Sequence, residues 1–218
     1  MTREEFQEYE KSAEAGDMFS IYLVGEHYLR GFVVEKNLAK AYEYHHKAAS
    51  LGYPPAVVST GLDLIAGIGV KKDTKKGLEY LKLISDLYGN SEDNLNDVVA
   101  EASYYIGAGY HDGEFGFFGK DKKAMPYLER ASKLGYAKAQ LLLSRLYYIG
   151  KGTPHDLDKA IFWAACAYLH GKNSPEESTK GRENLEFFVN HGILGGKEYV
   201  DGIIDDVKYN YKKYIVNP

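Results

Sequence analysis

The sequence predicts an all-α protein, a right-handed α-solenoid of antiparallel helix pairs, from two recurring phrases. In the first phrase a lysine precedes a small residue, and an aromatic residue follows three positions later. The small residues, Ala41, Gly77, Ala124 and Ala160, are spaced 36, 47 and 36 positions apart. A period in the thirties is typical of repeats that bury their apolar faces by stacking on their neighbours.

The second phrase lies ahead of the first and divides each repeat into two helices, here called helix A and helix B. A small residue is followed three positions later by a large one and six positions later by glycine. The small residues are Gly25, Gly61, Gly107 and Ser144, and the glycines are Gly31, Gly67, Gly113 and Gly150. The last glycine fits the left-handed position just past a helix end. We expect the small residues of helices A and B to face each other, because a glycine inside a helix otherwise costs about 1 kcal/mol relative to alanine.

The helix boundaries follow from capping residues. Asn37, Asp73 and Asp156 lie four positions before the small residue of helix B and are good N-caps, and in the third repeat Asp121 takes that role one position later. The predicted helices are 2–15, 17–29, 38–51, 54–66, 74–88, 97–110, 122–134, 137–149 and 157–170.

Three parts of the chain follow from this pattern. Residues 1–16 are expected to form an N-terminal capping helix. Residues 17–171 hold four helix pairs, about 17–52, 53–89, 97–135 and 136–171. Residues 172–218 are expected to form a C-terminal two-helix cap, which opens with the capping box Ser174-Pro-Glu-Glu177 and ends in a helix that is apolar on one face.

Composition restricts the classes of partner. The formal net charge of −4 argues against a nucleic-acid ligand, since such affinity depends on Lys and Arg neutralising phosphates. No apolar stretch is long enough for a membrane span, and the opening residues lack a signal-peptide core, so we expect a cytoplasmic protein without membrane insertion. The single cysteine, Cys166, cannot form an internal disulfide and is expected to be an ordinary buried thiol. A monomer is favoured.

The phrases resemble the Sel-one-like repeat family, which is related to tetratricopeptide repeats. The closest local match runs from Ala139 through Gly150-Lys-Gly152 to Trp163, and the resemblance covers about residues 12–171. It implies a superhelix of antiparallel helix pairs that serves as an adaptor for other proteins, with a bacterial origin. It supplies no catalytic residue and no cofactor.

The residues that could carry metal binding or catalysis have structural explanations. His45 and His46 are adjacent and point about 100° apart on a helix, and the other histidines lack a histidine partner at i, i+4. We expect solvated or capping histidines and no metal site. The glycines at 107–109 and 150–152 lack the phosphate-loop spacing and coincide with repeat positions. The sequence therefore predicts a non-enzymatic protein. The rival hypothesis is an enzyme that acts on cell-wall or small-molecule substrates. Paired histidine and carboxylate groups in a cleft would favour that rival.

Two surfaces are candidates for partner binding. The third A–B loop, Gly113 to Gly119, holds three phenylalanines that could either pack on the protein or insert into a partner. The helix A face offers one row with Tyr22, Glu26, Tyr104 and Arg145 and a neighbouring row with Asp63 and Tyr105, and periodicity leaves open which row is exposed. The predicted contact residues are Tyr22, Glu26, Asp63, Tyr104, Tyr105, Arg145, Phe115, Phe117 and Phe118.

The leading hypothesis is a scaffold or adaptor that binds a protein or peptide on its concave helix A surface. An immunity protein that neutralises a toxin by binding it is the alternative within this class. A structural or self-associating spacer is a third hypothesis.

Overall fold

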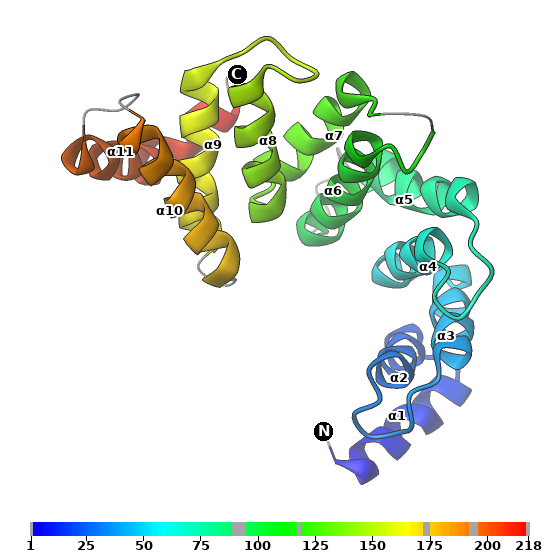
Figure 1. Cartoon of the computed structure of the whole chain (residues 1–218). Helices are drawn as coiled ribbons and strands as arrows, with labels where there is room; N and C mark the ends of the chain where they lie inside the picture. Colours follow the sequence, from blue (N-terminus) through cyan, green and yellow to red (C-terminus); the bar gives the residue numbers. More distant parts are fainter. Residues whose placement is uncertain (1, 89–94, 117–118, 172–174, 192–195, 217–218) are drawn as a thin grey trace. The chain divides into compact units, whose positions relative to one another are not determined.

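The computed structural model describes residues 2–88, 95–116, 119–171, 175–191 and 196–216, and the regular structure within these ranges is entirely α-helical (Figure 1). This confirms the predicted all-α class. The chain divides into two compact units, Met1–Val98 and Val99–Pro218. The two units are described separately below.

The first unit is a series of helices in which each packs on the next (Figure 1). Its helices are α1 (Arg3–Glu14), α2 (Met18–Arg30), α3 (Leu38–Ser50), α4 (Pro54–Ala66) and α5 (Thr74–Tyr88). The second unit contains α6 (Asn96–Asp112) from Val99 onwards, α7 (Asp121–Lys133), α8 (Ala137–Ile149), α9 (Leu157–His170), α10 (Pro175–Asn190) and α11 (Lys197–Val216). The ends of the first nine helices differ from the predicted ends by at most two residues.

The capping residues act largely as predicted. Asn37, Asp73 and Asp156 each accept a hydrogen bond of 3.0 Å from the backbone N–H three residues ahead. Asp121 is the exception, because it is the first residue of α7 and its carboxylate pairs with His111, so it caps no helix end. Ser174 lies outside the described residues.

Glycine ends several helices for two different reasons. Gly31, Gly67 and Gly150 have φ values of 73°, 76° and 66°, the left-handed conformation predicted for them. Gly171 has φ −69° and needs no such freedom. It is glycine because a Cβ there would lie 2.4 Å from the backbone nitrogen of Ser178.

Small residues bring the two helices of a pair together, as predicted. A Cβ on Gly77 of α5 would lie 2.5 Å from the carbonyl oxygen of Gly61 on α4. In the fourth pair the Ser144 hydroxyl donates a 2.7 Å hydrogen bond to the Ala160 carbonyl. The backbones therefore approach closely at the same position of both pairs.

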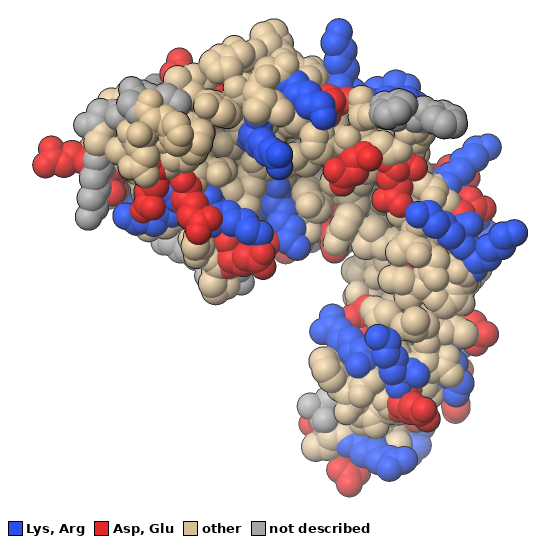
Figure 2. All heavy atoms as spheres, viewed as in Figure 1, with Lys and Arg blue, Asp and Glu red and all other residues tan. Residues whose placement is uncertain are grey.

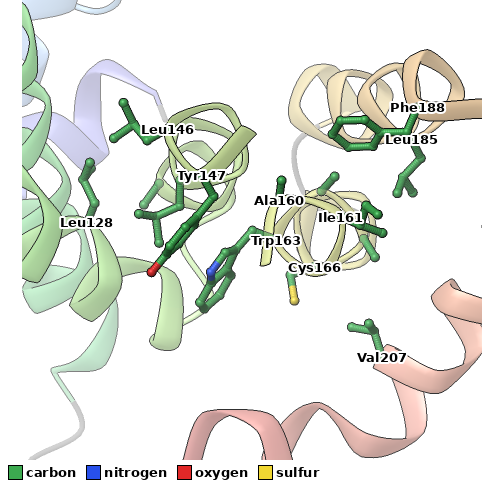
Figure 3. Packing of buried hydrophobic residues seen from close by; sticks show 14 of the residues in the cluster. Leu128, Leu146, Tyr147, Ala160, Ile161, Trp163, Cys166, Leu185, Phe188 and Val207 are labelled. Carbon is green, nitrogen blue, oxygen red and sulfur yellow. The ribbon is translucent and has the colours of Figure 1, made fainter. Parts of the chain in front are cut away.

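The core of the second unit is closed by its last two helices. Trp163 of α9 packs beside Tyr147 of α8, and the Cys166 thiol is directed towards the helix that carries Val207 (Figure 3). Leu185 and Phe188 of α10 cover another side of α9. Cys166 is fully buried, and burial raises the pKa of its thiol, so it is the ordinary buried cysteine that we predicted.

Candidate partner-binding groove

A groove of about 800 Å³ runs along the second unit between α6, α8 and α10. Helices α6 and α8 are the first helices of their pairs, so this is the helix A surface of this unit. Its lining residues include Tyr104, Ala108, Leu141, Arg145, Tyr148 and Phe187. We call this surface the inner groove.

The helical period explains why these side chains face the groove. On α8, Leu143, Leu146 and Tyr147 are buried in the core. Residues four apart share a face, so Leu141 and Arg145 stand together on the opposite side. On α6, Tyr104 and Ala108 have the same relation, and both are half-buried.

The far end of the groove has exposed apolar and aromatic surface. Ile149 is 51% exposed and Phe187 is 38% exposed. The Tyr148 ring contacts the Phe187 ring edge-on at 5.6 Å between centroids, and the Phe188 ring at 5.4 Å with a tilt of 57°. Aromatic side chains held in this way offer contact area to a partner at little conformational cost.

Charged groups are mixed over the same surface. Arg145 is exposed and makes no ion pair within the described part of the chain. Lys180 is held by Glu176 at 2.5 Å. Basic and acidic side chains lie close together over this unit in Figure 2, without a continuous basic area on the face in view. Mixed charges beside aromatic side chains are typical of protein–protein interfaces.

In the second to fourth repeats the two helix A rows that the sequence left open differ in exposure at the second residue of each pair, while at the first residue Val58 of the first row is buried. In the row that includes Asp63, the residues Asp63, Gly109 and Leu146 are buried. In the other row Glu26 and Ala108 are half-buried and Arg145 is exposed. Asp63 therefore offers no surface in this structure. Tyr105 is half-buried, with its ring against Tyr104 at 5.3 Å between centroids.

The predicted contacts of the first unit lie around a buried histidine. His45 is fully buried, which corrects the expectation of solvated or capping histidines. Its Nδ1 lies 2.8 Å from Asp63 Oδ2, and its Nε2 lies 3.4 Å from Glu26 Oε1, an ion-pair distance without hydrogen-bond geometry. Glu26 also pairs with Arg30 at 2.7 Å, and the Tyr22 ring lies 5.6 Å from the His45 ring.

Charge neighbours, rather than solvent, set the protonation of His45. Burial lowers the pKa of its imidazole, but the carboxylates of Asp63 and Glu26 outweigh burial and raise it to about 9. In return, His45 lowers the pKa of Glu26. At neutral pH the group is a buried imidazolium between two carboxylates.

The structure contains two histidine–carboxylate pairs among the described residues, the kind of group that the rival enzyme hypothesis called for. Glu26 and Asp63 lie at opposite nitrogens of a sealed ring, and no group of three potential metal ligands occurs among the described residues. The second pair, His111 and Asp121, meets at 2.5 Å at the edge of the inner groove. Ser144 lines the same groove, but its hydroxyl donates to the Ala160 carbonyl and not to His111. The nucleophile–base contact of an acyl-transfer site is thus not formed there.

The phenylalanine loop is described only in part. Phe115 is half-buried and packs back on α6, with its ring 5.3 Å from the Tyr110 ring and against Gly109. This residue packs on its own unit rather than projecting from it. Phe117 and Phe118 lie outside the described residues.

Residues of α10 complete the groove, and sequence reasoning missed them. Glu177, Lys180 and Phe187 lie beyond the last repeat phrase, so no repeated position marked them as part of the helix A surface. Their place could have been predicted from the repeat architecture, because a helix that follows the last pair packs where the next helix A would lie.

No described helix has both the length and the apolar character that crossing a membrane requires.

Comparisons with known proteins agree with this architecture. The family model described as "Sel1 repeat" matches residues 19–53, 64–88, 100–136 and 137–172. A Sel1 repeat protein from Oxalobacter formigenes has a similar structure, with a TM-score of 0.75 and 23% identity over 95% of this chain and 79% of that chain. The protective antigen c5321 of uropathogenic Escherichia coli, described as displaying an SLR fold, gives a TM-score of 0.62 and 22% identity over 93% of this chain and 43% of that one.

One curated relative is eukaryotic. The Chitin synthase regulator SKT5 of Saccharomyces cerevisiae is 26% identical over 172 residues. The match covers 78% of this chain, which spans about a quarter (24%) of that regulator's length.

Proposed function

The chain belongs to the Sel1 repeat family, whose members are generally protein-interaction scaffolds, and on this premise we propose that it binds a protein or peptide partner in the inner groove. The observation that carries the proposal is the groove itself. It exposes aromatic, apolar and charged side chains on helices that lie side by side, and interface hot spots are enriched in tyrosine and arginine.

The width of the groove suits an extended segment. Adjacent helices pack roughly 10 Å apart, so α6, α8 and α10 together span roughly 20 Å, the length of about six extended residues. Such a segment would pass Tyr104, then Arg145, then Phe187. Tyr22 and Glu26 occupy the equivalent positions on α2 and are proposed as contacts of the same kind in the first unit.

Reversing the charge of Arg145 tests this proposal. We expect Arg145→Glu to weaken partner binding by about tenfold or more, because the exposed guanidinium lies in the middle of the groove and has no competing ion pair among the described residues. Partners captured by the wild-type chain from native cells would be identified, and the dissociation constant of a purified partner would be measured by titration calorimetry.

The matched control is Lys122→Glu, an equal charge change at an exposed site on α7 that does not line the inner groove. It should leave the dissociation constant within about twofold. Equal affinity of wild type and Arg145→Glu would place the partner elsewhere and refute the proposal. A captured toxin whose activity the chain suppresses would assign it the immunity role, whereas a partner that it links to a third protein would assign it the adaptor role.

A further inference from the structure

Glu177 differs from the other acidic residues of the inner groove because its carboxylate is buried. It is only 6% exposed, although it lines the groove from the first turn of α10. Its Oε1 lies 3.8 Å from Lys138 Nζ, too far for a hydrogen bond. Its Oε2 has no hydrogen-bond partner in the part of the chain that the structure describes.

Among the described residues this arrangement leaves one oxygen of a strong acceptor without a donor, and the partner that a capping box would supply, the backbone N–H of Ser174, lies outside them. A buried polar atom without a partner typically costs 1–3 kcal/mol, and more when it is charged. The dipole of α10 favours a carboxylate in its first turn, but this attraction does not provide a hydrogen-bond donor for Oε2. Lys138 covers the carboxylate loosely, because its side chain is 50% exposed and is free to swing into solvent.

Tyr104 lines the groove together with Glu177, and its ring packs against Tyr136. The rings of Tyr104 and Tyr136 lie 5.0 Å apart between centroids, tilted by 33°. Burial is the main reason that the pKa of each phenol is raised, and the negative charge of Glu177 adds to the effect in both. The carboxylate therefore shares the groove with one of these aromatic side chains, Tyr104.

We propose that Glu177, with Tyr104 in the same groove, receives an arginine or lysine side chain of the peptide segment that occupies the inner groove. A buried carboxylate with an oxygen that lacks a donor, in a groove that also holds a tyrosine ring, can bind a cation by ion pairing and by cation–π attraction. The incoming cation displaces Lys138 and supplies the missing donor to Oε2. This inference rests on the proposed function and specifies which chemical group the groove selects.

The test uses the full chain and synthetic hexapeptides. Four pools share randomised flanks and carry arginine, lysine, glutamine or glutamate at one fixed position, and binding is measured by fluorescence polarisation. For the wild type we expect the arginine and lysine pools to bind about tenfold more tightly than the glutamine pool. Glu177→Gln should abolish this preference. Glu183→Gln, which removes an exposed carboxylate from the same groove, should retain it.

A second variant tests the same inference if Glu177→Gln alters folding. Lys138→Met removes the competing ammonium, so it should increase affinity for the arginine pool. If Glu177→Gln keeps the arginine preference, or Lys138→Met weakens arginine binding, the inference is wrong while binding in the groove stands. If no pool binds and Arg145→Glu leaves partner affinity unchanged, the inference and the proposed function both fail.

Discussion

Replacing His45 with leucine is expected to lower the free energy of unfolding by about 3 kcal/mol at pH 7. The side chain is fully buried between Asp63 and Glu26, and Asp63 is itself only 3% exposed. Leucine would leave the Asp63 carboxylate buried without its charge partner, which is the costly way to break a buried pair. Urea denaturation followed by circular dichroism, with hydrogen exchange of the α3 and α4 amides, measures the loss.

The double variant His45→Leu/Asp63→Leu is the matched control, and it should recover most of that stability. The third and fourth repeats have Leu128 and Leu146 at the corresponding positions, and both are buried in one core cluster (Figure 3). Gly107 faces Leu128 as Gly25 faces His45, so the fold already accommodates leucine opposite a helix A glycine. Glu26 keeps its partner Arg30. A double variant less stable than the single one would contradict this interpretation.

The same group makes wild-type stability depend on pH. The folded pKa of His45 is raised to about 9, above its unfolded value of about 6.5. Its contribution to stability is therefore complete below pH 6.5 and is lost as pH rises through about 9. The maximum loss is on the order of 3 kcal/mol. The double variant should lack this loss between pH 6.5 and 9, and an equal slope in both proteins would refute the assignment to His45.

The helices could be predicted because their signals are local. Each N-cap, C-terminal glycine and lysine–small–aromatic phrase lies within one turn of the element that it marks, and the N-cap bonds of Asn37, Asp73 and Asp156 confirm that reading. Asp121 failed as a cap because a partner from another helix, His111, competes for its carboxylate. Tertiary pairing of that kind leaves no trace in local spacing.

The site was less predictable, because it depends on helix rotation and on the last two helices. Rows of residues one position apart fit the period equally well, and only the packing of α8 leaves Arg145 exposed while Leu146 is buried. The prediction that His45 is solvated or caps a helix was wrong, because it relied on the residue type, and histidines are most often solvated. Its place, five residues after the repeat lysine, is that of Leu81 and Leu128, and both are fully buried. Position in the repeat was the better guide.

Replacing Gly77 with valine should destabilise the first unit by about 3 kcal/mol, because no side chain fits between α4 and α5 at this position. A Cβ there would lie 2.5 Å from the Gly61 carbonyl oxygen and 2.6 Å from Cγ1 of Ile65. The carbonyl belongs to a helix backbone, so relief requires the two helices to separate. Gly77→Ala should cause a smaller loss, since its single methyl group demands less separation and alanine favours the helix.

Gly202→Ala is the control for the glycine effect itself. Gly202 is an exposed glycine inside α11, and a Cβ there would meet nothing within 4 Å. Alanine should therefore raise the free energy of unfolding by about 0.5–1 kcal/mol through helix propensity alone. The two sites should thus respond with opposite sign to the same added methyl group, measured by urea denaturation. If Gly77→Ala instead stabilised the protein, the gain from alanine's helix propensity would exceed the cost of the close contact between α4 and α5. The close approach of these helices would then not be the reason for glycine at position 77.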